Sequence, residues 1–304
     1  MLQGRVEDAL SSAHLRKLKG RVNLIFTSPP FPLVRKKSYG NKVGYDYLLW
    51  LKDLAPKLSD LLTRTGSIVI ELGNAWVKGV PAMSTLPLKA LLAFQEAANL
   101  HLCQYIICHN PARLPSPAQW VNIKRVRLKD SFTHIWWLSK SEHPKASNRK
   151  VLLPYSADMQ NLLRTQKYNA GKRPSGHDIS PKGFLKDHGG AISSSVVSFA
   201  EDARVPESLI QMPNTSWDAN YREYCKQHEI TEHPARMRPE LAGFFVQMLT
   251  NRRDIVLDPF AGSNTTGAVA DFSGRRWIGV EQNKEFIKGS KGRFHRRERR
   301  RRRS

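Results

Sequence analysis

Cysteine is scarce in this chain, with three residues in 304. Cys103, Cys108 and Cys225 form no CxxC pair, which excludes a zinc site built on cysteine pairs and a disulfide framework. Reduced thiols, as in an intracellular protein, are therefore expected. His177-Asp178 has no further ligand residues at metal spacing, so we expect a turn there and no metal site in the protein.

Long hydrophobic runs are also missing. No apolar segment is long enough to span a bilayer, and the N-terminus lacks the charged-then-apolar order of a signal peptide. Acidic residues are outnumbered, since 26 Asp and Glu stand against 49 Lys and Arg and the net charge is +23. Residues 284–304 hold 11 basic and 2 acidic residues, a net +9, which leaves +14 for the rest. A body this basic indicates a polyanionic partner. No membrane partner is expected, because no segment is long and apolar enough to span a bilayer.

A stiff turn follows the first predicted strand. Residues 22–26 form an apolar run, and Ser28-Pro29-Pro30-Phe31 comes soon after it. Proline fixes φ and restricts the residue before it, so the carbonyls of Ser28 and Pro29 point in fixed directions. Together with the Ser28 hydroxyl and the Phe31 ring, these carbonyls could bind a planar ring that carries an amino group. These residues leave one alternative open, namely a proline-rich turn that leaves the strand and binds nothing.

A glycine-containing loop lies near the other end of the chain. Residues 254–263 predict a short strand and a tight loop, followed by a helix. Gly262 and Gly267 have the spacing of a phosphate loop, but Ala268 stands where that loop needs lysine, which argues against a nucleoside triphosphate. The following strand ends at Glu281, where a carboxylate is placed to accept hydrogen bonds from ribose hydroxyls.

Together the two motifs resemble those of amino-group DNA methyltransferases that use S-adenosylmethionine. SPPF at 28–31 precedes DPFAGSNTTG at 258–267, which is the order of the circularly permuted beta class. Further stretches resemble the PvuII-type N4-cytosine methyltransferases, namely Arg35–Asn41, Asn110–Pro117, Ile135–Lys140, Arg173–Asp178 and His233–Arg236. The likeness extends to about Phe286, and the arginine-rich tail does not share it.

The resemblance implies an α/β fold, a circularly permuted Rossmann-like methyltransferase sheet with an inserted loop-rich DNA target-recognition region. Independently, apolar periodicity predicts strands at 22–26, 67–72, 102–108 and 132–138, the last antiparallel, and helices at 7–18, 45–62 and 86–98. Such alternation is typical of a mostly parallel sheet covered on both faces. We expect residues 1–141 to form the catalytic half, 142–232 the target-recognition region, 233–288 the cofactor-binding half and 289–304 a disordered tail.

Site residues are assigned by the same resemblance. The catalytic set is Ser28, Pro29, Pro30 and Phe31, whose hydroxyl and carbonyl bind the amine while the phenyl ring stacks on the base. The set that binds S-adenosylmethionine is Asp258, Phe260, Gly262, Ser263, Glu281, Asp8, His233 and Pro234, with Asp8 at the adenine amino group and Glu281 at the ribose. Basic residues expected to contact DNA are Arg35, Lys36, Lys37, Arg113, Lys124, Arg125, Lys172 and Arg173.

The predicted reaction is site-specific methyl transfer from S-adenosylmethionine to N4 of a flipped cytosine in double-stranded DNA, in line, without metal or covalent intermediate. The cysteines follow Leu102, Ile107 and Tyr224 and never proline, so the thiolate route to carbon-5 has no candidate. N6-adenine methylation and a catalytically inactive DNA-binding relative remain alternatives, although serine before Pro-Pro favours cytosine. RNA is a weaker third substrate.

The predicted enzyme is either the modification arm of a restriction-modification system or a solitary methylase. A cognate restriction endonuclease would act on the same site without direct contact. The expected location is the cytoplasm, associated with the nucleoid, in a prokaryote, and the nucleus in a eukaryote.

Overall fold

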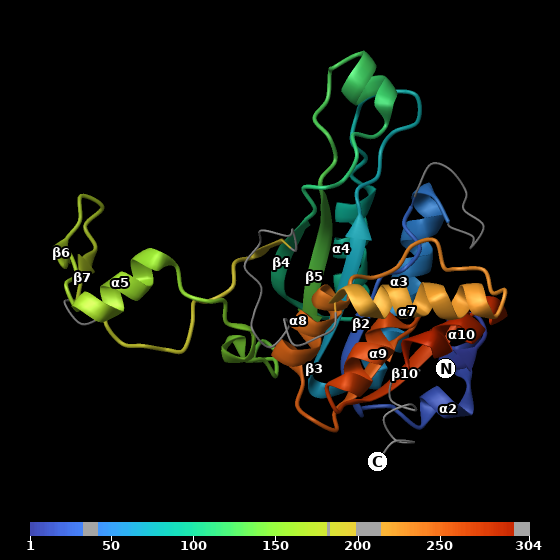
Figure 1. Cartoon of the computed structure of the whole chain (residues 1–304). Coiled ribbons are helices and arrows are strands. Elements are labelled where there is room, and N and C mark those ends of the chain that lie inside the picture. Colours follow the sequence, from blue (N-terminus) through green and yellow to red (C-terminus); the bar gives the residue numbers. More distant parts are fainter. Residues whose placement is uncertain (33–41, 181–182, 199–213, 295–304) are drawn as a thin grey trace.

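The computed structural model describes residues 1–32, 42–180, 183–198 and 214–294. Its centre is an eight-stranded sheet with the order β1-β10-β9-β2-β3-β5-β4-β8 (Figure 1). The strands are β1 (Leu2–Gln3), β2 (Val22–Thr27), β3 (Leu62–Gly73), β4 (His101–His109), β5 (Phe132–Ser139), β8 (Val196–Ser198), β9 (Ile255–Asp258) and β10 (Arg276–Glu281).

The sheet is mostly parallel, and its order shows the permutation. β9, from the C-terminal part of the chain, pairs with β2 in parallel, with Leu24 opposite Val256. β5 is antiparallel to both β3 and β4, as predicted for the last strand of the N-terminal part. β4 therefore runs in the same direction as β2 and β3. The permuted α/β sheet expected from the sequence is confirmed.

Helices cover both faces of the sheet because its central strands are apolar on both sides. In β2, Leu24, Ile25 and Phe26 are fully buried, but they divide between two hydrophobic clusters. One cluster packs under α3 (Gly44–Leu61) and α4 (Leu86–Ala97), and the other under α8 (Pro239–Leu249) and α9 (Thr265–Phe272). Alternation along a strand sends successive side chains to opposite faces, so each layer of helices has its own core.

The N-terminal helix differs from its prediction. The expected single helix at 7–18 is two short helices, α1 (Val6–Ser11) and α2 (Ala13–Arg16). Ser12 between them has extended dihedral angles, and its hydroxyl accepts a hydrogen bond from the Leu15 N–H at 3.4 Å. Serine competes with the helix through such local bonds, which ends α1 and caps α2.

Two projections leave this body. Residues 110–129, between β4 and β5, form an arm that rises at the top of Figure 1 and contains the π-helical turn η1 (Gln119–Ile123). Residues 155–180 and 183–190 form a lobe that stands to the left in Figure 1, with α5 (Ala157–Thr165), β6 (Gly171–Lys172) and β7 (Asp178–Ile179). Among the helices of the described ranges, none has the length and hydrophobicity that crossing a membrane requires.

The C-terminal part is more ordered than predicted. α7 (Asn214–Gln227), inside the region expected to be loop-rich, packs against α10 (Lys284–Ser290) and η3 (Lys291–Arg293). The tail predicted to be disordered from residue 289 is folded as far as Phe294, whose ring stacks on Trp277 at 5.2 Å. The prediction of disorder from residue 289 was wrong because the many basic residues there suggested a solvated tail, whereas several positions in 289–294 are buried. Residues 295–304 lie outside the described residues.

Candidate active site

A cavity of about 630 Å³ opens at the edge of the sheet where β2, β9 and β10 end. Both sequence motifs line it, residues 28–31 after β2 and 258–263 after β9. They meet because parallel neighbouring strands send their exit loops to the same edge. Thr27 Oγ1 donates a hydrogen bond of 2.6 Å to Asp258 Oδ1, which joins the two loops across 231 positions of sequence. The expected meeting of the two motifs at one cavity is confirmed.

Asp258 holds the second loop from inside. Its Oδ1 accepts hydrogen bonds from Thr27 Oγ1 and, at 3.0 Å, from the Phe260 N–H, while Oδ2 accepts from Thr266 Oγ1 at 2.7 Å. Burial raises the pKa of Asp258 to about 6, although these three bonds act to lower it. Because the protein itself uses both oxygens, the side chain fixes the shape of the loop.

The buried Asp258 carboxyl predicts that stability depends on pH. Its folded pKa of about 6 lies above the ordinary 3.8, so folding favours the protonated form. The stability that this form contributes is fully present below pH 3.8 and is lost as the pH rises through 6, with a loss of about 1–2 kcal/mol between pH 5 and 7.5. Urea denaturation at those two pH values should show a smaller loss for Asp258→Asn, which cannot ionise. An equal loss in the two proteins would contradict the role of this carboxyl.

His233 supports the same loop. Gly262 has a φ of +49°, and a Cβ added there would lie 2.9 Å from His233 Nε2, so this close contact requires glycine. Burial lowers the pKa of His233 to about 4, and its ring is therefore neutral near pH 7. The ring meets Phe286 edge to face at 4.5 Å, and the backbone N–H donates to the Tyr221 hydroxyl at 2.9 Å. Pro234, predicted beside it, is exposed and does not line the cavity.

Glu281 borders the cavity at the end of β10. Its Oε2 accepts a hydrogen bond from the Gly262 N–H at 2.9 Å, and Oε1 accepts one from the Asn283 N–H at 2.8 Å. Burial raises the pKa of Glu281, and these backbone bonds oppose the rise. The Gln282 backbone adds a third hydrogen bond, so three of the four lone-pair sites of the carboxylate are used and capacity remains for one further hydrogen bond. The arrangement suits a hydroxyl group of a ligand.

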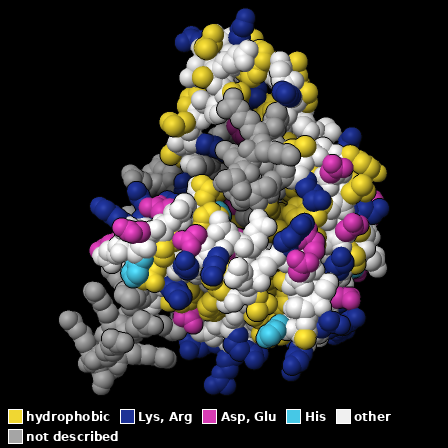
Figure 2. Space-filling model, turned by 90° about the vertical axis from the view of Figure 1, so that its right-hand side faces the viewer, with side chains coloured by type: hydrophobic (Ala, Val, Ile, Leu, Met, Phe, Trp, Pro, Cys, Tyr) yellow, Lys and Arg dark blue, Asp and Glu magenta, His cyan; other side chains and the backbone are white. Residues whose placement is uncertain are grey.

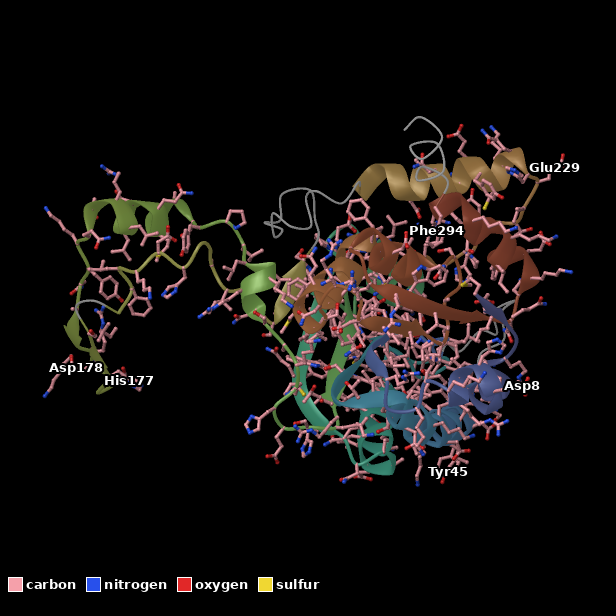
Figure 3. The ribbon with its side chains drawn as sticks, turned by 90° about the horizontal axis from the view of Figure 1, so that it is seen from below. Asp8, Tyr45, His177, Asp178, Glu229 and Phe294 are labelled. Atoms are coloured by element: carbon pink, nitrogen blue, oxygen red, sulfur yellow. The ribbon has the colours of Figure 1, made fainter. Side chains whose placement is uncertain are left out.

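The acid on α1 that faces the cavity is one residue earlier than predicted. Asp8 is exposed at the outer edge of the molecule in Figure 3, and Glu7 lines the cavity in its place. Glu7 Oε1 accepts a 2.8 Å hydrogen bond from Trp50 Nε1, and the Trp50 ring meets Phe260 edge to face at 5.5 Å. Burial acts to raise the pKa of Glu7, but hydrogen bonds from its own backbone, Trp50 and Arg5 outweigh that effect and lower it. Glu7, and not the predicted Asp8, is therefore the acid of α1 that a ligand in this cavity could reach.

Glu71 is a residue of the site that the sequence analysis missed. Its Oε1 accepts a 2.9 Å hydrogen bond from Thr133 Oγ1, and the carboxylate takes a second bond from the Ser28 hydroxyl. Burial raises its pKa, against the hydrogen bonds of Thr133 and Ser28 and the charges of Arg113 and Arg238. The available signal was a lone acid in an apolar strand, Ile68-Val69-Ile70-Glu71-Leu72.

Phe31 serves both the cavity and the core. Its ring lies so close to the Gly73 backbone that a Cβ added there would come within 2.5 Å of two ring carbons. The ring is partly buried against the core under α3 and α4, and it also lines the cavity. A rigidly backed aromatic face of this kind is suited to stacking on a flat ring.

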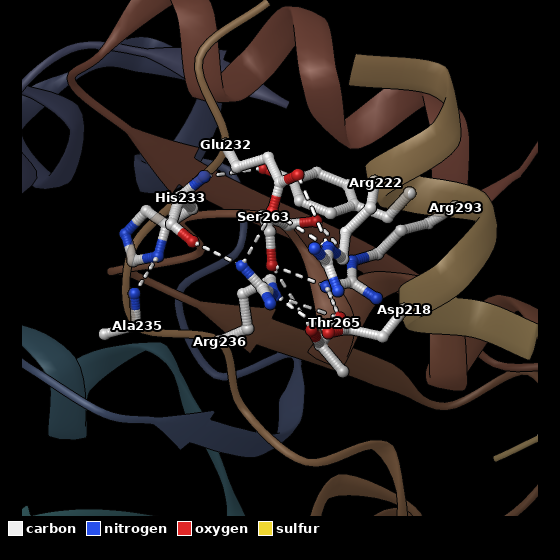
Figure 4. Close-up of polar contacts among 10 residues, drawn as sticks. Asp218, Arg222, Glu232, His233, Ala235, Arg236, Ser263, Thr265 and Arg293 are labelled. Atoms are coloured by element: carbon white, nitrogen blue, oxygen red, sulfur yellow. Dashed lines mark hydrogen bonds and ion pairs between the residues drawn. The ribbon is translucent and has the colours of Figure 1, made fainter. Parts of the chain in front are cut away.

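An ionic network links the cavity-lining residues His233, Arg236 and Ser263 to residues outside the cavity (Figure 4). Arg293 has a fully buried side chain that donates to Ser263 O at 2.7 Å and to Ser263 Oγ at 2.8 Å, and it pairs with Asp218 at 3.2 Å. Asp218 also pairs with Arg236 at 2.9 Å, and Arg236 donates to His233 O at 3.0 Å. The network thereby connects α7, the loop after β9 and the 233–236 segment.

The basic residues predicted to contact DNA have different locations. Lys124 and Arg125 are exposed on the arm, whereas Arg113 donates to Phe132 O at 3.2 Å near the base of the arm. On the lobe, which stands apart from the sheet in Figure 1, Lys172 is exposed and Arg173 is half-buried. Arg35, Lys36 and Lys37 lie outside the described residues. Within the parts of the chain that the structure describes, His, Cys, Asp and Glu form no group of three or more that could hold a metal ion.

Comparisons with known proteins agree with this site. The pattern of the DNA methylase family, of N6 and N4 type, matches residues 22–292. The chain is 40% identical over 275 residues to the type II methyltransferase M.PvuII of Proteus hauseri, a match that covers 90% of this chain and 78% of that protein. Its structure is similar to that of the cytosine-N4-specific PvuII DNA methyltransferase, with a TM-score of 0.70 and 31% identity over 96% of this chain and 84% of that one.

A more distant structure shares the fold alone. A DNA modification methylase of Thermus thermophilus, complexed with S-adenosyl-L-methionine, matches with a TM-score of 0.53 and 20% identity over 97% of this chain and 92% of that one. The fold and the site thus define a DNA-modifying enzyme of the methyltransferase class. The chain belongs to the N6/N4 DNA methylase family, and the resemblance seen in the sequence is confirmed.

Proposed function

We propose that this chain transfers a methyl group from S-adenosylmethionine to the exocyclic N4 of a flipped cytosine in double-stranded DNA. The observation that carries the proposal is the single cavity lined by Ser28–Phe31 on one side and residues 258–263 on the other. The identity of 40% with M.PvuII and the structural similarity to the cytosine-N4-specific PvuII DNA methyltransferase support N4 over other acceptors.

The residues around the second loop fit S-adenosylmethionine. The cavity, at about 630 Å³, is within the range of about 300–1,000 Å³ that is usual for small-molecule sites. Glu281 would accept a hydrogen bond from a ribose hydroxyl. The rings of Phe260 and Trp50 would pack against the adenine, and Glu7 would accept a hydrogen bond from the adenine amino group. Asp258 and Ser263 would shape the loop around the methionine portion. When bound, this donor supplies an electrophilic methyl group on a positively charged sulfonium.

The chain's own residues prepare the amine. The N4 lone pair of cytosine is delocalised into the ring, so the nitrogen is a poor nucleophile. We propose that the amine donates hydrogen bonds to Ser28 Oγ and to the Pro29 carbonyl, which favours tetrahedral nitrogen. The Ser28 hydroxyl in turn donates to Glu71, whose carboxylate can receive the proton that the nitrogen loses as its bond to carbon forms. Alignment of the reacting groups by such a site can supply about 7–11 kcal/mol of the barrier.

A methyl-transfer assay with a tritiated donor tests the proposal. Incorporation into duplex DNA, with N4-methylcytosine found by mass analysis of the digested product, is the expected result. N6-methyladenine in the product would show that the enzyme methylates adenine instead of cytosine. Label found in RNA and not in DNA would show that its substrate is RNA. A protein that binds DNA but transfers no label would be the inactive relative.

The biological setting forms part of the proposal. The enzyme would be the modification arm of a restriction-modification system, with an endonuclease acting on the same site without direct contact, or a solitary methylase. The enzyme would be located where its DNA substrate is, in the cytoplasm and associated with the nucleoid in a prokaryote, or in the nucleus of a eukaryote. The ranges 1–141, 142–232 and 233–288 would serve catalysis, target recognition and cofactor binding, with α7 supporting the cofactor half.

The buried arginine predicts an effect on donor affinity. Because Arg293 fixes Ser263 in the donor loop, Arg293→Met should weaken donor binding by about tenfold, in line with the loss of a charge-assisted hydrogen bond, while kcat at saturation stays nearly unchanged. Calorimetric titration with S-adenosylmethionine measures the affinity. Arg276→Met, which removes an exposed arginine that donates to Arg253 O, is the matched control. Unchanged affinity in a folded Arg293→Met protein would remove this role.

A further inference from the structure

We propose that the arm, residues 110–129, inserts apolar side chains into the DNA duplex and helps to open the base pair of the target cytosine. The inference rests on the proposed function and extends it to a part of the chain outside the cavity. It is carried by the composition of the arm, its internal order and its place on the sheet.

The arm exposes large apolar side chains to an unusual extent. The exposed fractions are 81% for Leu114, 74% for Ile123, 62% for Val126 and 89% for Leu128. A cluster of such side chains on one projection marks a surface that binds something, since isolated apolar residues are common but grouped ones are not. Figure 2 shows hydrophobic and basic side chains next to one another on the projection at the top, which the arm shares with the segment around Trp76.

Contacts within the arm, and one with Trp76 beside it, hold the arm in this shape, so the exposure is not that of a loose loop. Arg127 Cζ lies 3.3 Å from the centre of the Trp76 ring, and Arg127 Nη2 donates to Ser116 O at 2.9 Å. Lys129 Nζ donates to Pro111 O at 2.7 Å, and the Val126 N–H donates to Trp120 O at 3.0 Å. A framework of this kind lowers the cost of ordering the backbone when its apolar side chains bind.

The charge of the arm selects nucleic acid as the partner. Residues 110–129 contain five Lys or Arg and no Asp or Glu. A second copy of the chain would bring two such arms together, with like charges facing each other, which is unfavourable. Basic side chains beside apolar ones are the combination by which proteins contact phosphates and push wedges between base steps.

The topology places the arm where a bound duplex would meet it. β4 runs in the same direction as β2, so the arm leaves the same edge of the sheet as the catalytic turn. β4 lies three strands from β2 in the sheet order, or about 14 Å at the usual strand spacing. One turn of B-DNA spans about 34 Å, so a duplex with its target base in the cavity reaches the arm.

The test compares two substrates. One is a duplex oligonucleotide containing the site found by methylation-sensitive sequencing of DNA from cells that express the chain. The other is the same duplex with an abasic position opposite the target cytosine, which needs no base pair to be broken. Ile123→Ala with Leu128→Ala should lower kcat/KM on the paired duplex by about tenfold, because part of the opening cost of a few kcal/mol is no longer offset. On the abasic duplex the rate should stay within about twofold of wild type.

Control variants distinguish a wedge from a general loss of apolar surface or of charge. Leu92→Ala removes a similar side chain, 55% exposed on α4, and should leave both rates unchanged. Lys124→Ala with Arg125→Ala should weaken binding of both duplexes equally and reduce the salt dependence of binding, as loss of phosphate contacts does. Equal loss on both substrates for the apolar variant, or no loss, would overturn the proposed wedge. So would sedimentation that shows wild type as a dimer and the apolar variant as a monomer, because the apolar residues would then bind a second copy of the chain. Absence of methylation by wild type on either duplex would instead refute the proposed function.

Discussion

Replacing Glu71 with glutamine lowers kcat for methyl transfer by about 10²–10⁴-fold, the usual contribution of a positioned proton acceptor. Glutamine can still accept the Ser28 hydrogen bond, but it cannot receive a proton, so the loss isolates the basicity of Glu71. The KM for S-adenosylmethionine should be unchanged, since Glu71 is not among the residues assigned to S-adenosylmethionine. Glu71→Asp should restore part of the rate, and a Glu71→Gln enzyme with full kcat would end this role.

The pH profile gives Glu71 a second test. Burial raises its pKa above the ordinary 4.5, so the ionised form that the reaction needs disappears at a higher pH than usual. The rate at saturating substrate should therefore fall as the pH is lowered through this raised pKa. In Glu71→Gln that acidic limb should be absent, whereas the change in stability caused by Asp258 should persist.

Ser28→Ala is expected to reduce methyl transfer by about 10²-fold or more, because one side chain both accepts from the amine and donates to Glu71. Binding of S-adenosylmethionine should remain largely intact. Calorimetry with the donor and single-turnover methyl transfer measure the two effects separately. Ser263→Ala, which alters a serine on the donor side of the cavity, is the matched control and should weaken donor binding. Equal loss of donor affinity in Ser28→Ala would contradict a role confined to the amine.

The fold was predictable because its signals are local. The apolar run at 22–26 and the strand before Asp258 are each buried on both sides, and a strand of that kind needs a place inside a covered sheet. That these two strands belong to one sheet was predicted from the order of the two motifs in the chain, and β2 does pair with β9. The helices at 45–62 and 86–98 were found within one residue of their true bounds because their apolar spacing is regular.

The site was predictable where a motif was contiguous and missed where it was assembled in space. Residues 28–31 and 258–263 are compact stretches, and both line the cavity. Glu71 reaches the site from a neighbouring strand, and Arg293 from a basic tail that resembles a solvated run. Glu7 and Asp8 differ only in which side of α1 they occupy, which a short helix ended by Ser12 does not reveal in its sequence.

The position of β9 has a consequence for biosynthesis. β2 is an interior strand, yet one of its two neighbours is formed by residues 255–258, which leave the ribosome after most of the chain has been made. Until then the edge of β2 that pairs with β9 carries unsatisfied backbone groups, the kind of edge that promotes aggregation. Pairings this distant along the chain also slow folding. Nascent chains stalled before residue 254 should therefore depend on chaperones, and truncation at that point should leave no stable sheet.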